Sequence, residues 1–188
     1  MKAIIGLGNP GKEYEETRHN AGFLAIDILA SQLCASYWKD ECGASVAHVK
    51  NPANADEDLL LVKPQSFMNA SGGPVKKICE KYKIKINDVI VIHDDMDILP
   101  SKIKIKQGGS NAGHNGLKSI SEKLTSDDYK RIRVGIGHAS YNRPYISYVL
   151  GTPKGKAKDE FYDSIQKASE AALFMLNHSL DKAQQIFN

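Results

Sequence analysis

Short runs of β-branched and other apolar residues alternate along this chain with segments of helical periodicity, and this alternation limits the fold more than any other feature. The runs predict strands near residues 3–7, 45–50, 59–63, 88–93, 102–106 and 129–136. Apolar residues three or four positions apart predict helices near residues 21–34, 71–82, 115–124, 157–178 and 180–187. The pattern is typical of an α/β fold, so we expect a single domain with a mixed, mostly parallel twisted sheet and helices on both faces.

Composition limits the class of protein without indicating a function. The 188 residues, 41% of them hydrophobic and 25% charged, suit one domain over residues 1–188. No run approaches the roughly 18 apolar residues that cross a bilayer, and the first residues lack a signal-peptide pattern, so we expect a cytoplasmic protein without a membrane partner. Cys34, Cys42 and Cys79 are odd in number and form no C-x-x-C pair, which favours reduced cysteines without a disulfide or zinc site.

A glycine-rich turn, Gly6 to Gly11, follows the first predicted strand and formally matches the G-x-G-x-x-G motif of dinucleotide sites. Pro10 has no N–H for a pyrophosphate, and no ribose-binding acid follows at the expected distance. We therefore expect a tight turn with positive φ that leaves Asn9 projecting at the carboxyl end of a strand. A dinucleotide-dependent oxidoreductase remains the alternative class.

A histidine and an aspartate lie where a catalytic pair can form. His19 stands just before the helix predicted at 21–34, and its ordinary pKa makes it a candidate general base, although a surface or capping role is also common. Asp94 follows the strand 88–93, at the edge of the sheet where ligands bind in α/β folds, and can orient a histidine. We assign Asp95 to an acidic turn and leave Asp97 open between loop support and substrate contact.

Two asparagines occupy similar positions in other loops. Asn69 follows the strand 59–63, and Asn115 precedes the helix that begins near residue 117. An asparagine amide can donate to a developing oxyanion and accept from a substrate amide, although either residue alone also suits a turn or a helix N-cap.

Together these segments resemble the bacterial peptidyl-tRNA hydrolase family over residues 3–137. The resemblance rests on Gly6 to Gly11, Tyr14, Thr17 to Asn20, Lys63 to Asn69, His93 to Asp97 and Gly113 to Leu117. It implies an enzyme, a metal-free and cofactor-free monomer, that cuts the ester joining a peptide to the 3′ end of tRNA. The family's catalytic pair falls on His19 and Asp94, and its substrate contacts fall on Asn9, Tyr14, Met68, Asn69 and Asn115.

Basic residues at alternate positions suggest a surface for tRNA. Lys102, Lys104 and Lys106 share one face of the strand 102–106, while two isoleucines face the core. Arg131 and Arg133 likewise share one face of their strand, and the resemblance marks Lys104, Lys106 and Arg133 for contact with the tRNA backbone. A solvated face is the alternative, since the net charge is only +3, and a non-catalytic RNA-binding module is the alternative function.

The expected chemistry is direct attack by water. The chain lacks G-x-S-x-G and its cysteines lie in no recognisable motif, so a covalent acyl-enzyme is disfavoured. The sequence departs from the family at Ala139, where proline is common, and at Asn111-Ala112 in a usually glycine-rich loop. Both departures lie in loops that can tune access. Residues 139–153, with three tyrosines, two prolines and Gly151, predict an irregular loop with one short helix.

Overall fold

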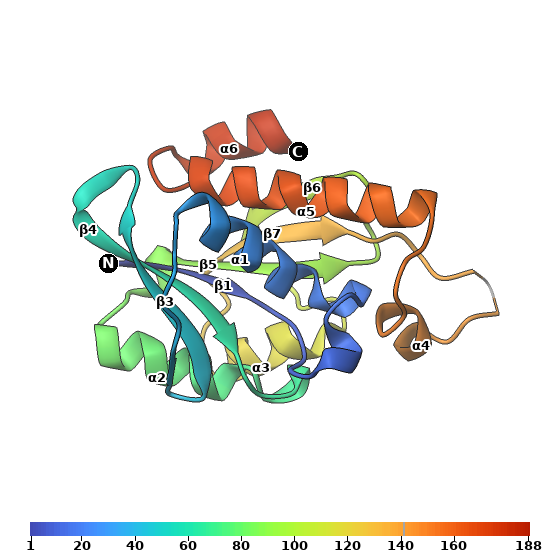
Figure 1. Ribbon diagram of the computed structural model, residues 1–188, viewed down its shortest axis with the longest axis horizontal. Helices are drawn as coiled ribbons and strands as arrows, with labels where there is room; N and C mark the ends of the chain where they lie inside the picture. Colours follow the sequence, from blue (N-terminus) through green and yellow to red (C-terminus); the bar gives the residue numbers. More distant parts are fainter. Residues whose placement is uncertain (141) are drawn as a thin grey trace.

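Seven strands form one mixed sheet in the computed structural model, which describes residues 1–140 and 142–188 (Figure 1). The strands are β1 (Lys2–Gly6), β2 (Lys39–Glu41), β3 (Ala44–Asn51), β4 (Asn54–Pro64), β5 (Val89–Asp95), β6 (Ile103–Gln107) and β7 (Lys130–Gly135). Their order across the sheet is β2-β3-β4-β1-β5-β7-β6. The central strands β4, β1, β5 and β7 are parallel, while β2, β3 and β6 join antiparallel at the two edges. The predicted α/β class is confirmed.

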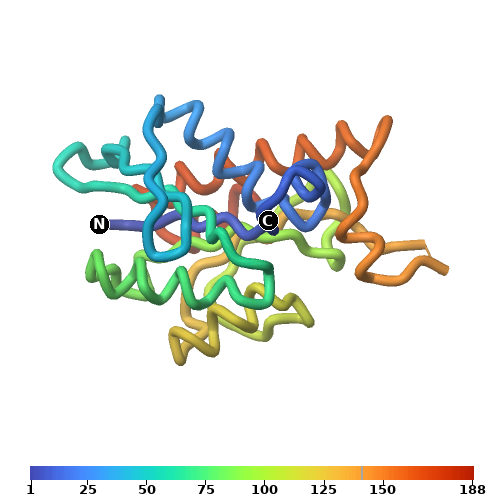
Figure 2. The backbone as a smooth tube through the Cα atoms, turned by 60° about the horizontal axis from the view of Figure 1, so that its bottom comes forward, coloured from blue at the N-terminus to red at the C-terminus, as the bar shows by residue number. Residues whose placement is uncertain are grey.

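Helices cover both faces of this sheet, as predicted. They are α1 (Ala21–Gln32), α2 (Gly72–Tyr82), α3 (Asn115–Leu124), α4 (Tyr145–Val149), α5 (Lys156–Phe174) and α6 (Leu180–Phe187). Side chains alternate along each strand, so Ile4 of β1 enters the core under α1, α5 and α6, while Ile5 enters the core over α2 and α3. Figure 1 shows these two helical layers above and below the sheet, and Figure 2 shows α2 and α3 side by side.

The boundaries that differ from the sequence prediction have local causes. Strand β2 was not predicted because Lys39-Asp40-Glu41 has no apolar residue, and it forms by pairing with β3 at the sheet edge. Strand β4 begins at Asn54 rather than 59 because its polar first half pairs with β3 in a hairpin. Helix α5 ends at Phe174 rather than 178, where the His178 ring stacks on Phe174 and its Nδ1 donates to the Phe174 carbonyl oxygen at 3.0 Å.

The segment 139–153 contains the short helix that its composition predicts, α4, and Tyr141 lies outside the described residues. Tyr148 fastens α4 to the sheet because its hydroxyl donates to the carbonyl oxygen of Ile136 at 2.6 Å. The guanidinium of Arg18 lies 4.3 Å from the centre of the Tyr148 ring and donates to the carbonyl oxygens of Tyr148 and Gly151. The segment is therefore joined directly to the residue that precedes His19.

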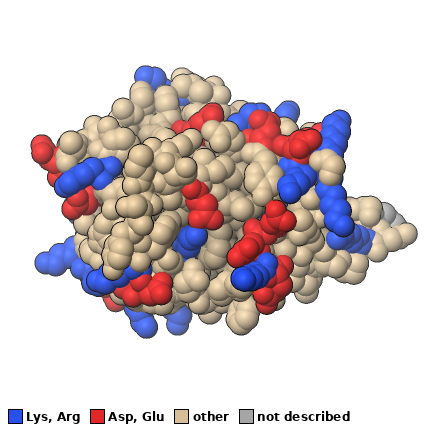
Figure 3. Space-filling view, in the orientation of Figure 1, with Lys and Arg blue, Asp and Glu red and all other residues tan. Residues whose placement is uncertain are grey.

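Charged side chains of both signs are interspersed over much of the face in Figure 3, and basic side chains gather at the end of the molecule that carries α4. All three cysteines are free, and burial raises the pKa of the Cys79 thiol to about 11. Among the described residues, no helix is long and apolar enough to cross a membrane.

Candidate active site

The turn after β1 packs directly on the start of α1, which brings His19 to the sheet. A Cβ on Gly6 would collide with the carbonyl oxygen of Gly22, and a Cβ on Gly22 would collide with the backbone of Leu7. Within Gly6 to Gly11 only Gly11 has a positive φ, 117°. The expectation of a turn with positive φ is therefore confirmed at Gly11, whereas Gly6 is required for the close approach of α1.

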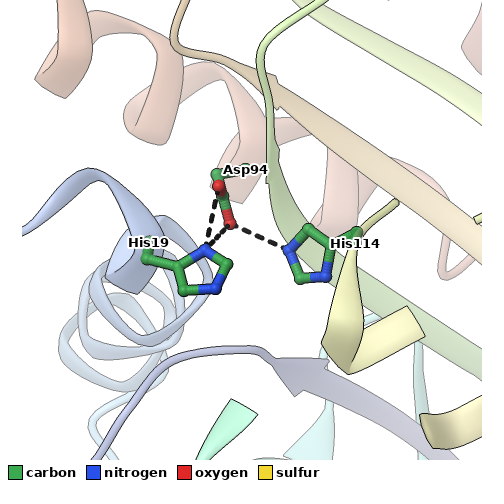
Figure 4. A group of neighbouring side chains, drawn as sticks. All are labelled: His19, Asp94 and His114. Atoms are coloured by element: carbon green, nitrogen blue, oxygen red, sulfur yellow. Dashed lines mark hydrogen bonds and ion pairs between the residues drawn. The ribbon is translucent and has the colours of Figure 1, made fainter. Parts of the chain in front are cut away.

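His19 and Asp94 meet in this packing (Figure 4). His19 lies in a single 3₁₀ turn, Arg18–Asn20, just before α1, and Asp94 lies near the carboxyl end of β5. The Nδ1 atom of His19 is 2.9 and 3.0 Å from the two carboxylate oxygens of Asp94. Both residues are buried, with 6% and 2% of their surface exposed. The two residues predicted as a pair are therefore in direct contact.

A second histidine, His114, binds the same carboxylate. Its Nε2 lies 2.9 Å from Oδ1 of Asp94, and its Nδ1 accepts from the backbone N–H groups of Gly116 and Leu117 at the start of α3. Because Nδ1 is an acceptor there, the proton of neutral His114 must sit on Nε2 and point at Asp94. In the sequence His114 stands out only within the block Gly113 to Leu117, and its place directly before a predicted helix is the signal that could have identified it.

This arrangement fixes the protons of the site. The Asp94 carboxylate has no proton to donate, so Nδ1 of neutral His19 carries a hydrogen and its Nε2 keeps a free lone pair. Burial lowers the pKa of His19, but the negative charge and hydrogen bond of Asp94 outweigh burial and raise it. Burial would raise the pKa of Asp94, yet His19 and His114 hold it far below its usual range. Asp94 therefore stays ionised, while His19 is the member of the pair that can exchange a proton.

The neighbouring His93 is unsuited to proton transfer. It is 2% exposed, its Nδ1 donates to the carbonyl oxygen of Asp94 at 2.8 Å, and its ring packs edge-on against His114. Burial, followed by the positive charge that His114 can carry, lowers the pKa of His93 to about 3. His93 therefore stays neutral and serves as packing beside the pair.

The His19, Asp94 and His114 cluster also has the composition of a metal site, since one ligand atom from each lies within 4.8 Å of the others. A metal on Nε2 of His114 would require the ring proton to move to Nδ1, where two backbone N–H groups already point. The hydrogen bonds thus fit a proton-transfer pair better than a metal centre.

Asn9 is held rigidly beside this cluster, with 7% of its surface exposed. Its Oδ1 accepts from the backbone N–H of Met68 at 2.8 Å, and its backbone exchanges two hydrogen bonds with the amide side chain of Asn20. The side-chain NH₂ of Asn9 is consequently the group left for a ligand. Asn20, which the sequence analysis did not single out, positions Asn9.

The other predicted substrate contacts lie on the adjoining loops. Met68 is buried and packs against Gly116, where any Cβ would lie only 2.6 Å from its sulfur. Asn69, in the 3₁₀ turn Met68–Ala70, and Asn115 are both exposed. Asn115 is the first residue of α3 and His114 is its N-cap, so the alternative of an N-cap role for Asn115 is wrong. Tyr14 is half-buried at the end of the 3₁₀ turn Lys12–Tyr14.

The predicted basic face lies beyond Asp94, on β6 and β7. Lys104 is exposed and pairs in register with Arg133, and half-buried Lys106 pairs with Arg131. Burial, followed by the charges of Arg131 and Arg133, lowers the pKa of Lys106. The cations therefore reinforce one another locally, which the small net charge does not reveal.

Arg131 of this face differs from its predicted role, and Asp95 at the end of β5 has a contact that was not predicted. Arg131 is fully buried and donates to the carbonyl oxygens of Gly109 and Ser110, so it shapes the loop before α3 instead of facing solvent. Asp95 does form the predicted turn, accepting from the backbone N–H of Asp97, but its other oxygen also accepts from Nε of Arg133 at 2.8 Å.

A cleft joins Asp94 and His114 of the histidine cluster to the basic face. It extends from Asp94 and His114 to Lys106 and Arg133, and Tyr145 of α4 closes one side. Asp97 stands at its rim, exposed, with a carboxylate oxygen 3.1 Å from Nε2 of His138. The cleft thus has at one end the carboxylate that holds His19 and at the other end the cations Lys106 and Arg133.

Comparison with known proteins assigns this architecture. The family model described as peptidyl-tRNA hydrolase matches residues 3–188. The chain belongs to the peptidyl-tRNA hydrolase family. A peptidyl-tRNA hydrolase of Neisseria gonorrhoeae is 40% identical over 188 residues, covering 100% of this chain and 97% of the relative, and one of Geobacter sp. is also 40% identical over 188 residues with the same coverage. The crystal structure of the peptidyl-tRNA hydrolase of Acinetobacter baumannii matches with a TM-score of 0.90 at 30% identity, over 98% of this chain and 93% of that chain.

Proposed function

We propose that this chain hydrolyses the ester bond between a peptide and the 3′ end of a tRNA, with His19 as the general base. The observation that carries the proposal is the contact of Nδ1 of His19 with Asp94, which leaves the lone pair of Nε2 free to accept a proton. Family membership supports this substrate, because the relatives named peptidyl-tRNA hydrolase match the chain over nearly their whole length.

The reaction needs one water and no covalent intermediate with the protein. Nε2 of His19 takes a proton from water as the water oxygen attacks the ester carbonyl carbon. The resulting imidazolium is stabilised by Asp94, and an amide N–H of a nearby asparagine can donate to the oxyanion. When the intermediate collapses, the bond to the ribose oxygen breaks and that oxygen receives the proton from His19. The products are a peptide carboxylate and free tRNA.

The asparagines suit a substrate whose amino group is already part of an amide. The NH₂ of Asn9 can donate to a peptide carbonyl, since its own oxygen is occupied by Met68. The exposed amides of Asn69 and Asn115 can accept from the substrate's N–H, and the thioether of Met68 offers an apolar wall. A free α-ammonium would lose its hydration without gaining a carboxylate here, so aminoacyl-tRNA should be spared.

Lys106 and Arg133 would hold phosphates of the tRNA at the far end of the cleft, and Lys104, which pairs in register with Arg133, would hold a phosphate beyond it. The alternative is that these side chains only face solvent. It suits Lys106 less well, because Lys106 is partly buried and the positive charges of Arg131 and Arg133 lie close to it. We expect the enzyme to act as a cytoplasmic monomer without metal or cofactor.

The test is turnover of N-acetyl-aminoacyl-tRNA by the purified chain, with the unacetylated aminoacyl-tRNA as the matched control. The proposal predicts rapid release of tRNA from the first and little from the second. Binding of tRNA without cleavage would indicate an RNA-binding module, and tight binding of NAD(P)H would favour the oxidoreductase alternative. Equal cleavage of both substrates would contradict the proposed role of the asparagines.

A further inference from the structure

Two chemically different groups of residues adjoin the histidine cluster. Asn9 and Met68, which do not line the cleft, offer an amide and an apolar wall. The second group lines the cleft, which leads past His114 to the cations Lys106 and Arg133. If the ester is cut at His19, as proposed above, the acyl group lies against the first group and the tRNA strand against the second. The nucleoside that carries the ester then lies between the reacting carbon and the cations.

Tyr145 also lines the cleft, together with Asp95 and His114. Its surface is 38% exposed, and its hydroxyl forms no hydrogen bond with any part of the chain from 1 to 140 or from 142 to 188. A large aromatic ring thus faces the cleft without a role in packing the core. The next residue, Ile146, is 68% exposed and is not among the residues that line the cleft.

The helix that carries the Tyr145 ring, α4, is held in place by contacts of Tyr148 and Arg18. One turn along α4, the Tyr148 hydroxyl donates to Ile136 of the strand-end segment, and Arg18 lies over the Tyr148 ring. The backbone N–H of Arg18 also donates to the carbonyl oxygen of Gly151 just after α4. The same Arg18 precedes His19, so α4 and the candidate base are positioned by one residue. Tyr145 therefore lines the cleft from a helix, α4, that is held by Tyr148 and Arg18.

We propose that Tyr145 is a stacking platform for the 3′-terminal adenine base of the tRNA, and so contributes to substrate recognition. Proteins bind unpaired ends of RNA mainly by stacking bases on aromatic side chains, and the open side of the cleft exposes the Tyr145 ring to such a base. The base is the planar part of the nucleoside that must lie between the ester and the cations. Burial, followed by the charges of Asp94 and Asp95, raises the pKa of Tyr145 to about 12. The phenol therefore stays neutral beside phosphates.

The first test compares two esters of one N-acetyl-amino acid, its 3′-adenosine ester and its methyl ester. Tyr145→Ala should raise KM for the adenosine ester by roughly 5- to 150-fold, the range of one lost base stack, and leave the methyl ester unchanged. Tyr145→Phe should behave like the parent, and Ile146→Ala is the matched control on the same helix. Equal losses on both esters would place Tyr145 in the chemistry or the acyl site and overturn the platform.

A second measurement does not depend on hydrolysis. A short oligoribonucleotide ending in CCA, with 2-aminopurine in place of the terminal adenine, should lose fluorescence on binding the parent and Tyr145→Phe proteins because the base stacks. It should keep its fluorescence with Tyr145→Ala. Unchanged quenching in Tyr145→Ala would refute the platform even if the parent cleaves peptidyl-tRNA, whereas quenching by a parent that cleaves nothing would refute only the proposed activity.

Discussion

Replacing Asp94 by asparagine should invert the tautomer of His19. The carboxylate accepts from both histidines, whereas an amide has only one oxygen. His114 must keep its proton on Nε2, because its Nδ1 is held by two N–H groups at the start of α3. The amide oxygen will therefore take the place of Oδ1, which lies 2.9 Å from both histidines, and the amide NH₂ will take the place of Oδ2, 3.0 Å from Nδ1 of His19. An NH₂ that points at Nδ1 favours the tautomer of His19 with its proton on Nε2, the atom that has to receive one.

The expected loss follows from removing a correctly protonated base. General base help is worth roughly 10²- to 10⁴-fold, which corresponds to about 3 to 5 kcal/mol in the barrier. The residual rate should also shift in its pH dependence. His19 works as the neutral base, so activity falls as the pH drops through its pKa. Asp94 raises that pKa against the effect of burial, so Asp94→Asn should move the acid limb to lower pH.

The assay is single-turnover hydrolysis of N-acetyl-aminoacyl-tRNA across pH 5 to 9, in a double-mutant cycle with His114→Asn. Asparagine is a good N-cap, so this second change keeps the start of α3 while removing the donor to residue 94. In that background the amide oxygen of Asp94→Asn is free to face His19, and the substitution should cost less than it does alone. The same loss in both backgrounds, with an unmoved acid limb, would refute the tautomer argument.

Three further perturbations test other parts of the structure. Reversing the charge of Lys104, Lys106 and Arg133 together should raise KM for peptidyl-tRNA, change kcat less, and flatten the salt dependence of tRNA binding; an unchanged affinity and salt slope would make them a solvated surface. EDTA should leave turnover unchanged, and chelator-sensitive activity restored by one metal would reverse our reading of the histidine cluster. Gly6→Ala should lower the free energy of unfolding by about 1 to 3 kcal/mol in a denaturant titration, since its Cβ meets backbone of α1; a stable variant would show that α1 can move away.

The sequence predicted the contact between His19 and Asp94, because strand order places Asp94 and the family resemblance assigns His19 as its partner. Asp94 ends a continuous apolar run that can only be a buried central strand, and parallel strands end at the same edge of a sheet. The strand β2 could not be predicted in this way, since it consists of polar residues and depends on pairing with β3.

The interactions that the sequence could not reveal all depend on turns. His114 reaches Asp94 because the preceding loop bends back at Ala112, which has a φ of 46°. Alanine rarely adopts a positive φ, so the residue type does not predict this bend. Arg131 looked like a partner of Arg133 on one strand face, but the loop carbonyls of Gly109 and Ser110 enclose it. Periodicity places a side chain on a face, and it does not say what covers that face.

The role of His19 as general base is tested most directly by the pH dependence of single-turnover hydrolysis of N-acetyl-aminoacyl-tRNA, measured for the parent chain and for His19→Ala, with tRNA affinity measured in parallel. We predict that His19→Ala binds tRNA with the affinity of the parent. It should hydrolyse N-acetyl-aminoacyl-tRNA roughly 10²- to 10⁴-fold more slowly and lose the acid limb of the pH profile. Hydrolysis within a few-fold of the parent rate, with the acid limb intact, would contradict the role of His19 as the base.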